Sequence, residues 1–240
     1  MHFMTLSQPI PPKRRRHWAI CVLCRVFGNS LSELSAPCSR GAQCSRRTSK
    51  ALVKPPFQLN QRSRAHERPN LAGVQIRTAT SGDATAIAEI YNQGIEERVA
   101  TYETTRRSAA DERAWLQSIA GRYPAVVAQI DSEIIGWAGA GPYRNRDCYR
   151  GIGEFSMYVH REWRRRGAGD LLLAGLITEA ERLGLWKLLS RIFLFNEASR
   201  ALCRKHGFRE VGVYEKHARL DGRWLDVVIV ERLIPANVTS

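Results

Sequence analysis

The sequence has no long hydrophobic run and few cysteines. No stretch of about 18 consecutive apolar residues occurs, which excludes a membrane-spanning helix. The one short apolar cluster, residues 18–23, lacks a small-residue cleavage site, so a secretory signal is not indicated. Of the six cysteines only Cys148 and Cys203 follow residue 73, which argues against a disulfide framework. A reducing compartment, the cytoplasm, is therefore expected.

Acidic residues are scarce in the first 73 residues. This stretch holds 13 Lys and Arg against two acids, a net charge of +11, whereas residues 74–240 hold 24 against 21, a net charge of +3. The stretch also lacks helical or strand periodicity. Its composition predicts a basic low-complexity arm that is disordered, or that is translated from a start upstream of the true one near Val74. A transit peptide and a nucleic-acid-binding tail are further interpretations.

The cysteine spacing in the arm does not fit a zinc ribbon. Cys21 and Cys24 form a close pair, but Cys38 and Cys44 lie six residues apart, and a ribbon needs two close pairs. A basic run alone supports only non-specific phosphate binding. We therefore expect no metal and no nucleic-acid partner, and we assign the function to residues 74–240.

Residues 74–240 are numerous enough for one hydrophobic core, and their patterning alternates between strands and helices. The expected strands are residues 75–79, 125–130, 134–140, 152–159, 187–193, 211–214 and 224–233, and the expected helices are residues 84–91, 109–121, 168–183 and 198–206. Three consecutive β-rich runs favour antiparallel pairing, and the later strand–helix–strand unit favours a parallel crossover. The prediction is a mixed α+β sheet flanked by helices, which excludes a doubly wound Rossmann fold.

The segment 158–169 has the pattern of an anion-binding helix start. It follows an expected strand and opens an expected helix, so free backbone N–H groups converge at the positive end of a helix dipole. Gly167 and Gly169 allow the backbone to approach a phosphate closely, and three arginines at 164–166 add positive charge. Neither GxGxxG nor GxxxxGK[ST] occurs, which excludes the common dinucleotide and P-loop motifs.

Two groups of motifs carry a family resemblance. Arg164-x-x-Gly167-x-Gly169 after Tyr158-Val159 resembles the pyrophosphate-binding motif of the GCN5-related N-acetyltransferases (GNAT superfamily), and Asn196-Glu-Ala-Ser199 with Gly207-Phe208 resembles their next motif. A narrower resemblance, to the phosphinothricin and arsinothricin N-acetyltransferases, rests on Ile76-Arg-Thr-Ala, Thr101-Tyr-Glu-Thr, Pro142-Tyr-Arg-Asn-Arg, Glu154-x-Ser-x-Tyr-Val159 and Gly222-Arg-Trp-Leu-Asp226. These motifs span residues 75–234 and cover none of the arm.

The resemblance implies both a fold and an activity. The fold would be a GNAT sheet that splays where acetyl-CoA binds. The activity would be acetyl transfer from acetyl-CoA to the α-amine of a small anionic amino acid analogue, such as phosphinothricin, arsinothricin or methionine sulfoximine. Acetylation removes the positive charge that such glutamate mimics need, so the biological consequence would be resistance. Relatives are commonly dimers, which implies a homodimer.

The resemblance also implies roles for individual residues. It places the catalytic base at Glu154, the only acid on an otherwise apolar strand, acting directly or through a water. Implied contacts to acetyl-CoA are Met157, Tyr158, Val159, Arg165, Arg166, Gly167, Ala168, Gly169, Asp170 and Asn196. Implied contacts to the amino acid substrate are Arg144, Arg146, Tyr149 and Tyr102. Guanidinium groups suit planar carboxylates and tetrahedral oxyanions.

Structural roles fit several of the same residues. Met157 and Val159 also fit strand core, and Asn196 also fits a helix N-cap. Arg144 and Arg146 fit a solvated basic loop nearly as well as a substrate pocket. These alternatives stay open from the sequence.

Two departures from the subgroup bear on the substrate. Ile152 and Cys203 stand where the subgroup often has Thr and His, which leaves the base and the phosphate loop intact. Tyr214 fits either a general acid for the leaving thiolate or a strand core residue. Acetylation of another small amine or of a protein N-terminus is an alternative function. Alternatives of other classes are an acetyl-CoA sensor without turnover and a nucleic-acid-binding protein that uses the arm.

Overall fold

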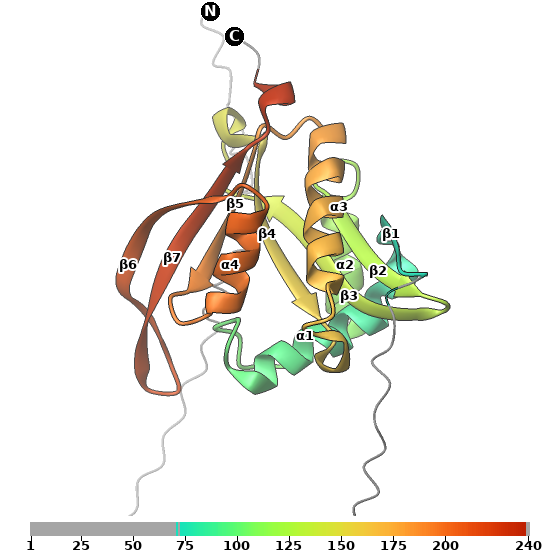
Figure 1. The fold of residues 1–240 in the computed structure, drawn as a ribbon, viewed down its shortest axis with the longest axis horizontal. Coiled ribbons are helices and arrows are strands. Elements are labelled where there is room, and N and C mark those ends of the chain that lie inside the picture. The colour runs from blue at the N-terminus through green and yellow to red at the C-terminus, as the bar shows by residue number, and fades with distance from the viewer. Residues whose placement is uncertain (1–70, 72, 239–240) are drawn as a thin grey trace, which may run out of the picture. The chain divides into compact units, whose positions relative to one another are not determined.

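The computed structural model describes residue 71 and residues 73–238 of the chain. The arm predicted over residues 1–73 lies outside the described residues except for residues 71 and 73, and so do the interpretations made of it. The described chain forms one 7-stranded sheet in the order β1-β2-β3-β4-β5-β7-β6, flanked by four α-helices (Figure 1). The predicted mixed α+β sheet is confirmed.

The strands and helices follow the predicted order. The strands are β1 Gln75–Thr78, β2 Ala125–Ile130, β3 Glu133–Pro142, β4 Ile152–Val159, β5 Lys187–Phe193, β6 Arg209–Leu220 and β7 Arg223–Leu233. The helices are α1 Ala84–Glu97, α2 Ala109–Ile119, α3 Ala168–Arg182 and α4 Glu197–Lys205. Most bounds agree with the sequence pattern to within a few residues, because buried apolar faces set the period of both kinds of element.

β6 differs most from its prediction. The sequence pattern predicts a strand over residues 211–214, whereas β6 spans 12 residues, nearly all of them exposed. It is the edge strand beyond β7, and its register shifts between Tyr214 and Ala218. An exposed edge strand with an irregular register has no alternating buried face, so the sequence carries little signal for it.

The sheet splits between β4 and β5. β4 pairs with β3 along its whole length, but it pairs with β5, in parallel, only from Ile152 to Glu154. β5 then pairs with β7 along its whole length. The two central strands therefore separate after Glu154, and the predicted splay is confirmed.

The helices cover both faces of the sheet (Figure 1). On one face, Tyr91 of α1 packs its ring 4.8 Å from the ring of Tyr158 in β4. On the other face, a side chain added at Gly136 of β3 would meet Leu172 of α3 at 2.7 Å. Because side chains alternate along a strand, each side chain of β4 points either to the face covered by α1 or to the face covered by α3.

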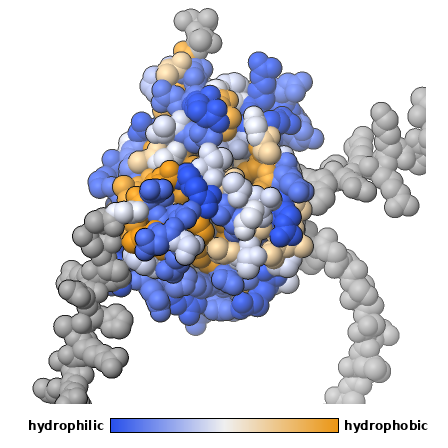
Figure 2. Space-filling model, turned by 90° about the vertical axis from the view of Figure 1, so that its right-hand side faces the viewer, coloured by the Kyte–Doolittle hydropathy of each residue, from blue (hydrophilic) through white to orange (hydrophobic). Residues whose placement is uncertain are grey.

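Polar side chains dominate the surface at the β1 end of the domain, where apolar side chains show only in patches (Figure 2). Within the described residues, no helix is both long and apolar enough to cross a membrane.

Candidate active site

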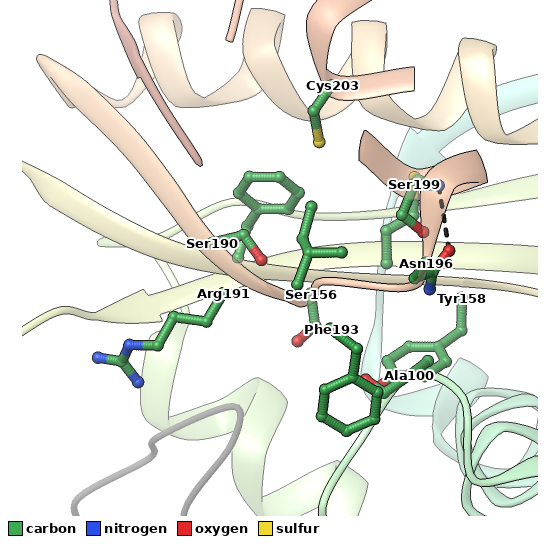
Figure 3. A pocket seen from close by; sticks show the side chains of 12 residues that line it. Ala100, Ser156, Tyr158, Ser190, Arg191, Phe193, Asn196, Ser199 and Cys203 are labelled. Atoms are coloured by element: carbon green, nitrogen blue, oxygen red, sulfur yellow. Dashed lines mark hydrogen bonds between the residues drawn. The ribbon is translucent and has the colours of Figure 1, made fainter. Parts of the chain in front are cut away.

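The gap between β4 and β5 opens into a cleft of about 490 Å³, counting the part open to solvent. Its lining comes from both separated strands, from α4 with its N-cap, and from the segment after α1: Ala100, Phe155, Ser156, Met157, Tyr158, Ser190, Arg191, Ile192, Phe193, Asn196, Ser199 and Cys203. Arg191 and Phe193 lie on one side of the strands and Cys203 lies on the other (Figure 3). The cleft thus passes between the strands and connects the two faces of the sheet.

β4 presents unused backbone groups to this gap. The N–H of His160 donates to the carbonyl of Ile135 in β3 at 2.9 Å, so the even-numbered residues of β4 direct their backbone groups toward β3. The N–H and C=O groups of Met157 therefore face the gap, beyond Glu154, where the pairing of β4 with β5 ends. A ligand in the gap can take the place of the missing strand.

The loop after β4 has the geometry of an anion site. α3 begins at Ala168, with Gly167 as its N-cap at φ +98°, a conformation that disfavours any side chain. The first N–H groups of a helix have no partner within it and carry the positive end of its dipole. Arg165, also at positive φ, and Arg166, which lies over the ring of Trp163 at 5.5 Å, flank this helix start.

The loop is tied to its neighbours by ion pairs. Arg164 donates from Nε to the carbonyl of Val159 at 2.9 Å, and its Nη1 lies 2.5 Å from Oε2 of Glu97 at the end of α1. Arg164 thus braces the loop against β4 and α1. Asp170, in the first turn of α3, pairs with Lys205 at 2.7 Å and His206 at 2.9 Å. The hydrogen bonds from Lys205 and then His206 lower the pKa of Asp170.

Glu154 lies at the point where the strands separate. It is 2% exposed, and its Oε1 is 3.0 Å from Nη1 of Arg191 in β5. That oxygen accepts no hydrogen bond among the described residues, so the contact with Arg191 is an ion pair without hydrogen-bond geometry. Burial raises the pKa of Glu154, and the charge of Arg191 opposes this shift. A carboxylate whose pKa is raised is a stronger base, which suits it to accept a proton.

Two more buried polar atoms on the same face lack partners. The side chains of Ser156 and Trp137 share the face of Glu154, because Ser156 is two residues along β4 and Trp137 lies opposite Tyr158 in β3. Ser156 Oγ and Trp137 Nε1 make no hydrogen bond within the described part of the chain. Buried polar groups are normally satisfied, and Ser156 lines the cleft, so its hydroxyl is placed to bind a polar ligand there; Trp137 is not among the lining residues.

The residues predicted to contact acetyl-CoA gather around the cleft and the loop. Asn196 caps α4 by accepting from the N–H of Ser199 at 3.2 Å, which confirms the N-cap alternative, and it also lines the cleft (Figure 3). Tyr158 is 7% exposed and its hydroxyl donates to the carbonyl of Ala100 at 3.3 Å. Val159 uses its carbonyl to accept from Arg164. Their contacts to the cofactor stay predictions.

The residues predicted to contact the substrate do not form one group. Arg144 and Arg146 line a separate hollow of about 630 Å³, counting the part open to solvent, with Arg122 and Arg150, and Glu154 is in the lining of neither this hollow nor the cleft. Tyr149 packs edge-on against Tyr143, 5.6 Å between ring centroids. These three residues belong to the β3–β4 loop, at the end of the sheet where β4 begins.

Tyr102 lies apart from these three residues, next to the end of β5. Its ring packs edge-on against Phe193 at 4.8 Å, and its hydroxyl donates to the carbonyl of Leu225 at 3.3 Å. Tyr102 therefore packs behind Phe193, which lines the cleft, and is not itself among the lining residues. Its contact with a substrate stays a prediction.

Arg191 is the residue that the sequence pattern did not single out. Its signal was a charge between Ser190 and Ile192 inside an otherwise apolar strand. Within the described residues no cluster of three or more His, Cys, Asp or Glu side chains could hold a metal ion.

A splayed mixed sheet with an anion-binding helix start beside the gap is the architecture of acetyl-CoA-dependent N-acetyltransferases. The family model of the Acetyltransferase (GNAT) family matches residues 87–208. The chain belongs to this family, and it is an acetyl-CoA-dependent N-acetyltransferase.

Individual relatives resemble the same part of the chain. A phosphinothricin N-acetyltransferase of Streptomyces coelicolor is 34% identical over 168 residues, 68% of this chain and 98% of the relative. An L-methionine sulfoximine/L-methionine sulfone acetyltransferase of Pseudomonas paraeruginosa is 34% identical over 160 residues, 66% of this chain and 93% of the relative. A solved phosphinothricin acetyltransferase from Sinorhizobium meliloti in complex with AcCoA has a TM-score of 0.64 and 35% identity, covering 68% of this chain and 89% of that one.

Proposed function

We propose that this N-acetyltransferase acetylates the α-amine of a small anionic amino acid analogue of the phosphinothricin, arsinothricin or methionine sulfoximine type. The observation that carries the proposal is Glu154, a buried carboxylate held beside a cation where β4 and β5 part, with one oxygen that accepts no hydrogen bond from the described residues. The names of two relatives, phosphinothricin and L-methionine sulfoximine acetyltransferases, support the same substrate class.

Glu154 acts as the base in this proposal. An α-ammonium has no lone pair, so Glu154 accepts one proton, directly or through a water, before the amine nitrogen attacks the thioester carbonyl. The C–S bond breaks as the amide forms. The nitrogen releases a second proton, which balances protonation of the leaving thiolate, and the proton on Glu154 passes to solvent.

The phosphate loop and β4 hold the acetyl-CoA co-substrate in this proposal. The helix start at Gly167 and Ala168 receives the pyrophosphate, and Arg165 and Arg166 add charge around it. The gap-facing backbone of Met157 binds the pantetheine arm in place of a strand. Arg164 has a different task, because its guanidinium already braces the loop against Val159 and Glu97.

Acetylation would make the protein a resistance factor. The amide nitrogen of the product carries no positive charge, so a toxic glutamate mimic loses the ammonium by which it is recognised. We assign this role to residues 74–240 and place it in the cytoplasm.

The test is thiol release from acetyl-CoA by the full chain. The acceptors are L-phosphinothricin, arsinothricin, L-methionine sulfoximine, the ordinary L-amino acids, a polyamine and a peptide with a free N-terminus. We expect the highest kcat/KM with one of the three anionic analogues. A higher kcat/KM with the polyamine or the peptide would overturn the proposed substrate.

We also infer that two copies associate through the edge strand β6. Among the described strands, β6 pairs with β7 alone, and it exposes the apolar side chains of Val211 and Val213. Unpaired edges with exposed apolar side chains favour pairing with a second chain. Light scattering after gel filtration is expected to give twice the mass of one chain, and a monomer at micromolar concentration would contradict the inference.

A further inference from the structure

The Glu154–Arg191 ion pair has the charge arrangement that an α-amino acid complements. In an α-amino acid the ammonium nitrogen and the carboxylate oxygens lie roughly 3 Å apart, because both groups are bonded to the same carbon. Glu154 Oε1 and Arg191 Nη1 are 3.0 Å apart and carry the opposite charges. An amine that reaches Glu154 therefore brings its own α-carboxylate to the guanidinium of Arg191.

Arg191 is placed to meet a ligand in the cleft. It belongs to the part of β5 that no longer pairs with β4, it lines the cleft, and its side chain is 17% exposed. Its guanidinium extends on the side of the strands opposite Cys203 (Figure 3). Arg144 and Arg146 line a separate hollow, and the ion pair at Glu154 is made by Arg191.

A bulge in β6 adds a neutral polar group near Arg191. The register shift between Tyr214 and Ala218 includes Lys216 at φ +47°, whose N–H donates to Asp226 Oδ1 at 2.7 Å. His217 follows, with its ring stacked on Tyr214 at 4.9 Å. Burial and then the charge of Arg191 lower the pKa of His217, so its ring is neutral at pH 7. Bulges often redirect side chains beside active sites.

We propose that Arg191 binds the α-carboxylate of the amino acid substrate, and that the ammonium and carboxylate of the substrate replace the Glu154–Arg191 ion pair on binding. This inference rests on the proposed function, and it names the residue that makes the enzyme select α-amino acids. A polyamine has no carboxylate to offer, and a protein N-terminus carries an amide in that position. Neither of these acceptors would bring a carboxylate to the guanidinium of Arg191.

The experiment compares two acceptors that differ only in the α-carboxylate. They are L-phosphinothricin and its decarboxylated analogue, 3-aminopropyl(methyl)phosphinate. Arg191→Gln is expected to lower kcat/KM for phosphinothricin about 10- to 100-fold, mainly through KM, because a hydrogen bond to a charged group is lost. The value for the analogue should change less than threefold, so the preference for the amino acid collapses. Arg191→Lys keeps the positive charge, so it should recover part of the preference for phosphinothricin over the analogue.

The pH profile supplies a second readout. Among the described residues, Arg191 is the charge that acts on the pKa of Glu154, and the charge of Arg191 also lowers the pKa of His217 in β6. Burial raises the pKa of Glu154 and the charge of Arg191 lowers it, so the pKa of Glu154 should rise further when Arg191 is lost. The rising limb of kcat/KM against pH is therefore expected to move to higher pH in Arg191→Gln.

Controls separate this inference from a folding defect and from the proposed function. Arg182→Gln removes an exposed arginine at the end of α3 and should leave both acceptors unaffected. An unchanged KM for acetyl-CoA in Arg191→Gln shows that the cleft is intact. Equal losses for both acceptors, with wild-type enzyme active on phosphinothricin, would overturn the role of Arg191 alone. A wild-type enzyme that acetylates no amino acid would overturn the proposed function and this inference together.

Discussion

Replacing Glu154 by Gln removes the proposed base while keeping the side-chain volume and an oxygen beside Arg191. Glu154 is 2% exposed and burial raises its pKa, which makes its carboxylate a stronger base than an ordinary glutamate. A positioned base contributes about 10²- to 10⁴-fold to the rate, which is about 3 to 5 kcal/mol of transition-state stabilisation. We expect kcat to fall by this factor. KM for acetyl-CoA should stay constant, because the loop at Gly167 and the gap-facing backbone of Met157 are unchanged.

Initial rates measured against pH test the assignment more sharply than a single rate. In the wild-type enzyme, kcat/KM should rise with pH through the pKa of Glu154, above its ordinary value of 4.5. Glu154→Gln should lack this limb and keep only the one from the amine. Glu89→Gln, an exposed acid on α1, is the matched control with wild-type rates. A Glu154→Gln enzyme within threefold of wild type, or one that keeps the limb, would refute the reasoning.

The pH dependence of the free energy of unfolding should also reflect the raised pKa of Glu154. Its folded-state pKa is raised, so its contribution to stability is present below the unfolded-state pKa and is lost as pH rises through the folded-state pKa. Urea unfolding of Glu154→Gln is expected to show a smaller loss of stability than wild type between acidic and neutral pH. An identical pH dependence would contradict the raised pKa.

Three further substitutions probe the loop and the core. Gly167→Ala places a side chain at φ +98°, where left-handed backbone costs about 1 to 2 kcal/mol; KM for acetyl-CoA should rise roughly 5- to 30-fold, and an unchanged KM would contradict the loop's role. Glu97→Gln weakens the brace on Arg164, so titration with acetyl-CoA should show a several-fold higher KM at constant kcat; a fall in kcat alone would exclude a positioning role. Leu172→Ala, at a fully buried position of α3, should lower the free energy of unfolding by about 2 to 5 kcal/mol in urea, and a loss below about 1 kcal/mol would mean that the site collapses.

The strands and helices, and the anion-binding loop, could be predicted because their signals are local. Apolar spacing marks α1 and α3, and Gly167 marks a backbone conformation that a single residue type favours. The position of Glu154 in β4 was equally readable as an acid inside an apolar strand. β6 was largely missed, since an exposed and bulged edge strand leaves no alternating pattern.

The sequence by itself determined the order of the elements, the family and the chemistry of the loop, because each rests on residues close together in the chain. Only the tertiary structure decided where β4 and β5 part: β5 pairs with β4 only as far as Glu154 and with β7 along its whole length, and such pairing joins residues that are far apart in the chain. It also decided that Arg191, 37 positions after Glu154, stands 3.0 Å from it, while Arg144 lines a different hollow. Distances between remote side chains follow from the packing of the whole sheet, which local patterns do not encode.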